Sequence, residues 1–284
     1  MADRIINQLE DHKRYGYGPD IPIVVGRPVV QAVVTGDEVA AWYWAHEKMR
    51  WDPNVDFGVI RPPFESMWVE WAMPPAHLRV GFTSTVDIEA AAVFVNYNKD
   101  DDAFDYLTIH RVRGLGIVVL PIFNRVRLTG AGTYESGGVE FDERASDHRF
   151  FQEVREAIAD GRDLGYERFG SHELLLILSM MNCVNASIED ERASKGDVRR
   201  ARQHGLPLHQ IKKIRVPGGR ATTKRSMVQA LGGPQALHLV RGHFKTYTAE
   251  APLFGKRVGS YWWGWQQRGK AEAGTIDHVY EVTP

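Results

Sequence analysis

Short segments rich in β-branched residues recur along the first half of the chain, and glycines, prolines or acidic residues separate them. β-Branched side chains suit a pleated, partly buried surface, so segments of this kind are typical of strands. The sequence therefore predicts a succession of short strands, at residues 22–25, 29–34, 67–71, 78–82, 92–97, 106–112 and 117–128. The acidic tripeptide Asp100–Asp102 is predicted to form a turn.

Helical patterns interrupt these strands. The spacing of Thr35 and Glu38 is that of a capping box, which predicts the start of an amphipathic helix. Ser146 and Ser171 are each placed to cap a helix further along the chain. The helix after Ser171 is apolar nearly all round, over residues 174–181, and this predicts that it is buried.

The pattern becomes β-like again toward the C-terminus. A short basic helix is predicted at 192–204 and a long loop at 217–234, with strands at 208–216, 237–247, 258–265 and 276–282. The fold class is therefore predicted as α+β, with mixed or antiparallel sheets, a central helical segment and a basic β-rich C-terminal region. We expect an acidic mixed α/β region at 1–145, and the helical segment and basic region at 146–284. The alternative that both form one continuous domain stays open.

The chain has one cysteine, Cys183, which excludes an intrachain disulfide and a site with several cysteine ligands. Its longest apolar stretch, residues 174–181, is far shorter than the roughly 20 residues that cross a bilayer. The first residues include acids and form no apolar segment, unlike a secretory signal. We therefore expect a cytoplasmic protein with no membrane partner.

Charge is distributed very unevenly along the chain. The formal net charge is −1, yet the segment from Arg192 to Lys270 holds 17 lysines and arginines and only two acids, Asp197 and Glu250. Such asymmetry is typical of a surface that meets nucleic acid or another polyanion. The alternative is that the acidic remainder packs against the basic segment and neutralises it.

The strand predicted at 237–247 carries the most chemically suggestive side chains. Alternate residues of a strand share one face, so four side chains are expected to line up: Arg241, His243, Lys245 and Tyr247. Arginine and lysine bind phosphate, histidine titrates near neutral pH, and tyrosine offers a stacking surface or a proton donor. The set predicts nucleic-acid binding or metal-independent catalysis, and a solvated strand face is the alternative.

Aromatic residues alternate with cations further along the chain. A turn is predicted before Lys256 and Arg257, and the aromatic run 261–265 follows. Single-stranded nucleic acid binds where flat rings meet bases and cations meet phosphates. On a strand, Trp262 points away from the face of its neighbours, so one set of rings is expected in the core and the other partly exposed.

Charge and aromatic content together predict a set of nucleic-acid-binding residues. They are Arg199, Arg200, Arg202, Lys212, Lys213, Arg215, Lys224, Arg225, Arg241, Lys245, Lys256, Arg257, Tyr261, Trp262 and Arg268.

Recognised cofactor and metal motifs are absent from the sequence. It contains no GxxxxGK[ST], HExxH or GxSxG pattern. The histidine pairs His204/His209 and His238/His243 have i,i+5 spacing, which matches no common metal-ligand rhythm. We therefore expect neither a cofactor nor a metal.

Several C-terminal segments occur in a fixed order: MNCVN at 181–185 preceded by Met180, RRAR at 199–202, HLVRGHFKTYT at 238–248, APLFGK at 251–256 and GSYWW at 259–263. This arrangement resembles a group of uncharacterised accessory proteins of bacteriophages and prophages, to which residues 61–71 are also loosely similar. The resemblance implies a phage setting and no particular reaction. Gln267 stands where the resemblance leads us to expect a histidine, which argues against a catalytic group there.

These observations lead to one principal hypothesis and two alternatives. The principal hypothesis is a phage-type cytosolic accessory protein that binds RNA or DNA through its basic, aromatic-rich C-terminal region. The first alternative is a metal-independent, endoribonuclease-like enzyme. The second is an interaction protein that acts on host or phage proteins. The sequence selects neither an oligomeric state nor one type of nucleic acid.

Overall fold

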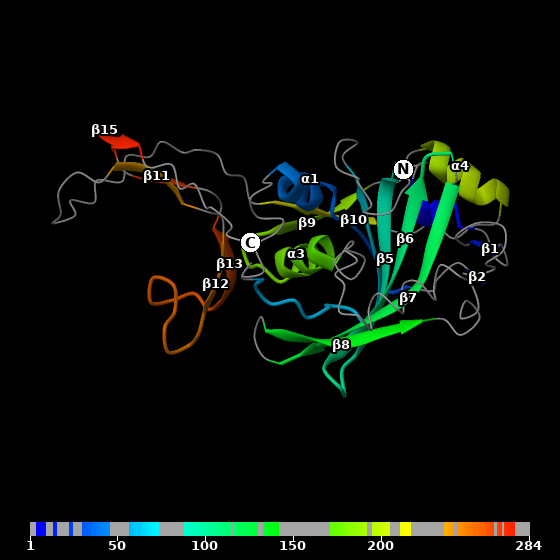
Figure 1. The fold of residues 1–284 in the computed structure, drawn as a ribbon, viewed down its shortest axis with the longest axis horizontal. Coiled ribbons are helices and arrows are strands. Elements are labelled where there is room, and N and C mark those ends of the chain that lie inside the picture. Colours follow the sequence, from blue (N-terminus) through cyan, green and yellow to red (C-terminus); the bar gives the residue numbers. More distant parts are fainter. Residues whose placement is uncertain are drawn as a thin grey trace, which may run out of the picture.

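The computed structural model describes residues 4–9, 14–15, 23–24, 30–45, 57–73, 88–114, 116–129, 133–141, 171–191, 195–204, 211–216, 236–240, 243–263, 266–268 and 270–275. One large sheet dominates this part of the chain, and a few helices and three small sheets accompany it (Figure 1). The α+β prediction is confirmed at this level, because the large sheet is mixed and mainly antiparallel and helices are few. None of the helices in the described ranges is long and apolar enough to span a bilayer.

The large sheet has eight strands in the order β8-β7-β6-β5-β4-β3-β10-β9. In chain order they are β3 (Ala32–Thr35), β4 (Ser66–Ala72), β5 (Ile88–Asn98), β6 (Ala103–Val112), β7 (Gly116–Leu128), β8 (Tyr134–Phe141), β9 (Ser187–Glu191) and β10 (Ile211–Arg215). Strands β4 to β8 form an antiparallel meander, whereas β3 is parallel to both β4 and β10. Strands from both sides of residue 145 thus contribute to the same sheet.

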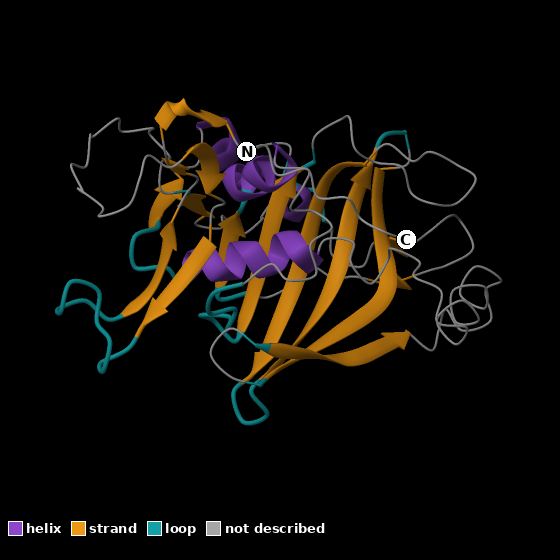
Figure 2. Ribbon diagram, turned by 60° about the vertical axis from the view of Figure 1, so that its left-hand side comes forward, coloured by secondary structure: helices purple, strands orange, loops and turns teal. Residues whose placement is uncertain are grey.

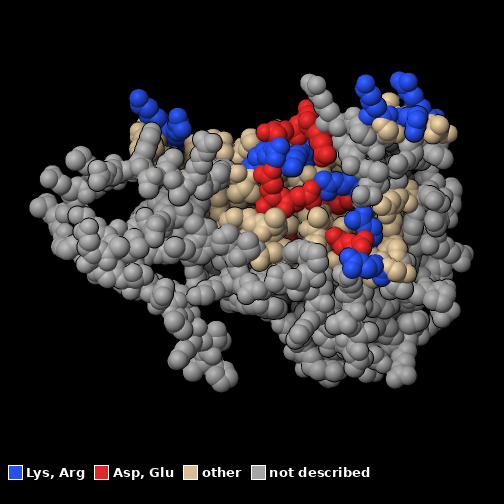
Figure 3. Space-filling view, turned by 90° about the horizontal axis from the view of Figure 1, so that it is seen from above, with Lys and Arg blue, Asp and Glu red and all other residues tan. Residues whose placement is uncertain are grey.

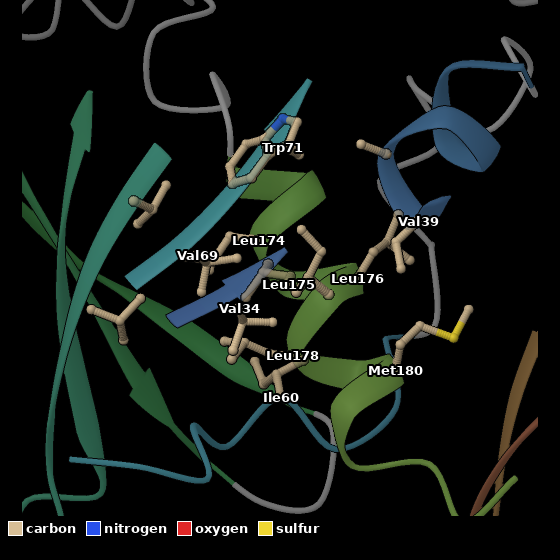
Figure 4. Packing of buried hydrophobic residues seen from close by; sticks show 14 of the residues in the cluster. Val34, Val39, Ile60, Val69, Trp71, Leu174, Leu175, Leu176, Leu178 and Met180 are labelled. Carbon is tan, nitrogen blue, oxygen red and sulfur yellow. The ribbon is translucent and has the colours of Figure 1, made fainter. Parts of the chain in front are cut away.

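Helices α1 (Asp37–Ala45) and α3 (Ser171–Met181) lie over one face of this sheet. Their apolar side chains meet Val34 of β3 and Val69 of β4, and Leu174 and Leu178 of α3 project toward these strands (Figure 4). The approach is so close that a Cβ atom at Gly36 would overlap Ile177. The buried helix predicted after Ser171 is therefore present, and Figure 2 shows it lying across the strands.

The opposite face of the sheet is covered by the short 3-10 helix η1 (Ile5–Asn7). Ile5 and Ile6 are fully buried beside Trp68, and the buried Glu70 accepts hydrogen bonds from the Ile5 N–H (2.7 Å) and the Trp68 indole N–H (3.0 Å). Burial raises the pKa of Glu70, although these hydrogen bonds and Arg4 oppose the shift. The carboxylate thus joins the beginning of the chain to the centre of the sheet.

The remaining described elements form small sheets and one separate helix. Strand β1 (Arg14–Tyr15) pairs with β2 (Ile23–Val24), and β11 (Ala236–Val240) lies between β14 (Gln266–Arg268) and β15 (Lys270–Thr275). Strand β12 (His243–Tyr247) pairs with β13 (Gly259–Trp263) as an antiparallel hairpin. Helix α4 (Lys195–His204) is short and amphipathic.

Two local predictions are wrong. Helix α1 begins at Asp37, and the Ala40 N–H donates to the Gly36 carbonyl at 2.8 Å, so Thr35 ends β3 and does not cap the helix. The strand predicted at 237–247 is divided between β11 and β12, which belong to different sheets. The helix predicted from Ser146, the loop at 217–234 and the strands at 78–82 and 276–282 lie outside the described residues.

Candidate nucleic-acid interface

The hairpin β12–β13 has one face turned toward the core. Phe244 and Trp262 are directly opposite each other in the register, and their ring centroids lie 4.6 Å apart. Trp262 also meets Trp42 of α1 edge-on, at 4.9 Å between centroids. Alternation along both strands therefore buries this face and leaves the neighbouring residues to form the outer face.

The connection between α3 and β9 holds the hairpin in place. The Asn185 side-chain amide donates to the Trp262 carbonyl at 2.7 Å, and the Trp262 N–H donates back to Asn185 Oδ1 at 2.9 Å. The Val184 N–H donates to the Ser260 carbonyl at 2.9 Å, and Cys183 is buried beside Ser260. Burial raises the pKa of the Cys183 thiol to about 12.

Asn182 in the same connection binds a third part of the chain. Its side-chain amide donates to the carbonyls of Val59 at 3.0 Å and Arg61 at 2.8 Å, as well as to that of Leu178 in the preceding helical turn. The conspicuous sequence at 181–185 therefore has an architectural role, because its two asparagines join three segments that are distant in sequence.

The outer face of the hairpin presents the side chains that strand alternation predicts to lie together. His243 and Lys245 are exposed, and Tyr247 is half-buried. Lys245 Nζ lies 5.1 Å from the centroid of the Tyr247 ring, and Tyr261 supports that ring edge-on at 5.8 Å. A cation and an aromatic ring thus share one accessible surface.

Arg241, the fourth member of the predicted catalytic set, lies outside the described residues. The other three members are His243, Lys245 and Tyr247, all on the outer face of β12. Within the described ranges no group of three or more histidine, cysteine, aspartate or glutamate side chains is arranged to hold a metal ion. The catalytic role stays a prediction.

The loop that joins β12 to β13, residues 248–258, adds two cations to this surface. Lys256 and Arg257 are exposed, and neither they nor Lys245 form an ion pair with any carboxylate in the described part of the chain. Figures 1 and 2 both show the loop projecting beyond the ends of the two strands. We call the outer face of β12–β13 and this loop the hairpin surface.

Two aromatic residues predicted to bind nucleic acid are too buried to stack on a base. Trp262 is 3% exposed in the core, and Tyr261 is 6% exposed beneath Tyr247. A base needs an accessible ring face, so the assignment of both residues to the interface is corrected. Their burial depends on partners such as Trp42 that are remote in sequence.

The three predicted cations of β10 are neutralised by carboxylates. Lys212 lies 3.2 Å from Asp190, and Lys213 lies 3.7 Å from Glu38. Arg215 pairs with Glu38 and, at 2.9 Å, with Glu189. Figure 3 shows acidic and basic side chains interleaved over the middle of the face seen from above. We call this set, Lys212, Lys213, Arg215, Glu38, Glu189 and Asp190, the paired cluster. The ion pairs weigh against its cations as phosphate ligands, and their role in binding stays a prediction.

Helix α4 carries a further group of cations. Arg199 and Arg202 are exposed and, three residues apart, lie on the same side of the helix. Figure 1 places α4 and the hairpin toward opposite ends of the longest axis of the molecule. The described cations therefore form separate groups and do not make one continuous basic surface.

Besides Arg241, four predicted residues are described only in part or not at all. Lys224 and Arg225 lie outside the described residues, and nothing is described of the Arg200 and Arg268 side chains. Sequence reasoning also missed Phe254, whose side chain is 82% exposed in the hairpin loop. The sequence feature that could have identified Phe254 is its position in the predicted turn before Lys256 and Arg257.

Comparison of the chain with protein-family models, curated proteins and solved structures finds no match.

Proposed function

We propose that the protein binds nucleic acid through the hairpin surface. The observation that carries the proposal is the cation Lys245 beside the ring of Tyr247, on an exposed strand face. Lys256 and Arg257 extend the same surface, and no described carboxylate pairs with any of the three cations. Accessible cations beside aromatic rings suit phosphates and bases respectively.

The contrast with the paired cluster supports the choice of this surface. A cation already held by a carboxylate gains little from a phosphate, because the carboxylate must first be displaced or brought close to a like charge. An unpaired cation loses no such partner and releases a condensed counterion from the nucleic acid instead. The hairpin surface is therefore a better polyanion site than the paired cluster.

The wider setting of this proposal is a phage-type accessory protein of the cytoplasm, with a central helical segment and a basic β-rich C-terminal region. The resemblance of residues 251–256 and 259–263 to phage and prophage accessory proteins supports that setting. These residues form most of the hairpin loop and all of β13.

The proposal is tested by the salt dependence of binding. We compare the triple variant Lys245→Ala/Lys256→Ala/Arg257→Ala with wild type, using labelled single-stranded and duplex oligonucleotides. Each lost phosphate contact reduces the magnitude of the slope of log K against log salt by about 0.7–0.9, so the triple variant should reduce it by about 2–3. The matched control, Lys212→Ala/Lys213→Ala/Arg215→Ala, removes the same charge from the paired cluster and should change the slope by less than 1.

Two outcomes contradict the proposal. In the first, wild-type protein forms no salt-sensitive complex with either oligonucleotide at low ionic strength, which means that it does not bind nucleic acid. Equal losses of slope in the two triple variants mean that the total charge of the protein, and not the hairpin surface, controls binding.

A further inference from the structure

The tip of the hairpin loop holds an aromatic ring away from the core. Phe254 is 82% exposed, and its backbone has a φ of 53°, in the left-handed region that residues other than glycine rarely adopt. An exposed phenylalanine contributes little to folding, and this backbone conformation costs free energy. The fold therefore gains no stability from the feature, and a feature of this kind is typical of a binding site.

The backbone of the tip is fixed by its own hydrogen bonds. The Leu253 N–H donates to the Arg257 carbonyl at 2.7 Å, and the Arg257 N–H donates to the Leu253 carbonyl at 3.0 Å. The Gly255 N–H donates to the Pro252 carbonyl at 3.1 Å, and Gly255 follows Phe254 with a φ of 68°. The ring is thus presented by a closed turn and requires little further ordering when a ligand arrives.

Charge around the tip favours an anionic ligand. Lys256 and Arg257 follow Phe254 after a single glycine and are exposed without an ion pair to any carboxylate that the structure describes. Glu250 lies on the other arm of the loop and accepts a hydrogen bond from the Thr248 side chain, which lowers its pKa. The loop therefore exposes one flat ring and two cations within four consecutive residues, the two kinds of group that contact bases and phosphates.

We propose that Phe254 stacks on an unpaired base, so that the protein prefers single-stranded nucleic acid to a duplex. This proposal rests on the nucleic-acid binding proposed above and specifies its substrate class. The faces of an unpaired base are accessible, whereas a base in a duplex is stacked on both sides and must be unstacked before a ring can enter. Stacking on an aromatic ring is largely independent of base identity, so little sequence preference is expected.

An anionic membrane is the other polyanion that an aromatic ring and two cations can meet. Insertion into a membrane depends on the buried apolar area. The large apolar side chains exposed in this loop are Phe254 and Val258, and Lys256 and Arg257 lie between them in the sequence. This small, interrupted apolar surface favours a nucleotide over a lipid bilayer.

The experiment measures the affinity of full-length Phe254→Gly protein for a single-stranded oligonucleotide and for a duplex of the same length. Glycine removes the ring and accepts the positive φ, so the turn is retained. We expect a loss of about 5- to 150-fold for the single strand, the range that corresponds to loss of one stacked base, and less than about a twofold change for the duplex. Phe254→Trp should retain single-strand affinity, and Val258→Ala, in the same loop, should match wild type.

The outcomes separate this proposal from the one on which it rests. If Phe254→Gly binds the single strand as tightly as wild type, stacking is wrong while the cationic surface stands. If Phe254→Gly weakens duplex and single strand equally, the preference for unpaired bases is wrong. If wild type binds neither oligonucleotide, the proposed function itself fails. Binding only to vesicles of anionic phospholipid, lost in Phe254→Gly, overturns both proposals in favour of a membrane.

Discussion

The paired cluster and the hairpin surface each contain two lysines and an arginine but present them differently. In the paired cluster, Lys212, Lys213 and Arg215 face three carboxylates, so the local charges cancel. On the hairpin surface, Lys245, Lys256 and Arg257 meet no described carboxylate, and Lys245 lies beside the ring of Tyr247. A basic stretch of sequence is therefore not a basic surface until the partners of each cation are known.

The difference arises from what each region packs against. Strand β10 pairs with the acidic strand β9 and lies beside the N-terminus of α1, which supplies Glu38. The hairpin packs its inner face against apolar side chains, including Trp42, and neutral asparagine holds its edge. The hairpin thus exposes its cations because its anchoring requires no charge.

The largest expected effect comes from removing that apolar anchor. Trp262→Ala should lower the free energy of unfolding by about 3–5 kcal/mol, since it leaves a cavity between Phe244 and Trp42. Lys245→Ala, on the outer face of the same hairpin, should change it by less than about 0.5 kcal/mol. Urea denaturation of both variants measures the difference. Equal effects would show that the inner face does not anchor the hairpin.

A smaller effect should follow from loss of the asparagine anchor. Asn185→Ala leaves the N–H and carbonyl of Trp262 without their partner, which should cost about 1–3 kcal/mol. Cys183 reports on this change, because the thiol is buried and its pKa is raised to about 12. We expect a thiol reagent to label wild type very slowly at pH 8. It should label Asn185→Ala about tenfold faster or more, because each loss of about 1.4 kcal/mol changes an equilibrium constant tenfold.

The control for the asparagine anchor is Asn98→Ala, which removes an exposed hydrogen bond to Asp101 and should leave thiol labelling unchanged. A labelling rate for Asn185→Ala that matches wild type would mean that the hairpin stays docked without this contact.

Above about pH 9 the Cys183 thiol ionises in the unfolded chain before it does in the folded protein, so the free energy of unfolding should decline as the pH rises.

Sequence reasoning predicted the elements whose signal is local. Strands β4 to β7 were predicted because they are long and rich in apolar, β-branched residues. Strand β9 was missed because its sequence, SIEDE, is acidic and exposed, and only its pairing with β10 makes it a strand. Strand β8 was also missed, because its two adjacent glycines hide the alternation of side chains that is typical of a strand.

The same limit applies to the candidate interface. The common face of His243, Lys245 and Tyr247 follows from alternation along one strand, so it could be predicted. The neutralisation of Arg215 could not be predicted, because its partner Glu38 is 177 residues away in the chain. Similarly, the burial of Trp262 depends on contact with a helix from the first half of the sequence.

The smallest expected effect tests whether pairing alone separates the two regions. Glu189→Gln/Asp190→Asn preserves the shape of β9 but releases Lys212 from its carboxylate and Arg215 from one of its two. Each freed cation that reaches a phosphate should increase the magnitude of the slope of log K against log salt by up to about 0.7–0.9. Because these pairs are exposed, the free energy of unfolding should change by less than about 1 kcal/mol.

The matched control for this change is Glu65→Gln/Asp101→Asn. It releases Lys99, at the turn between β5 and β6, from Glu65 and Arg125 of β7 from one of its two carboxylates, and it alters the net charge by the same amount. We expect this control to leave the salt dependence unchanged, since that turn lies outside the hairpin surface and the paired cluster. If both double variants steepen it equally, net charge controls affinity, and the carboxylates of β9 do not distinguish the two regions. If only the β9 variant responds, those carboxylates are what keeps β10 from binding a polyanion.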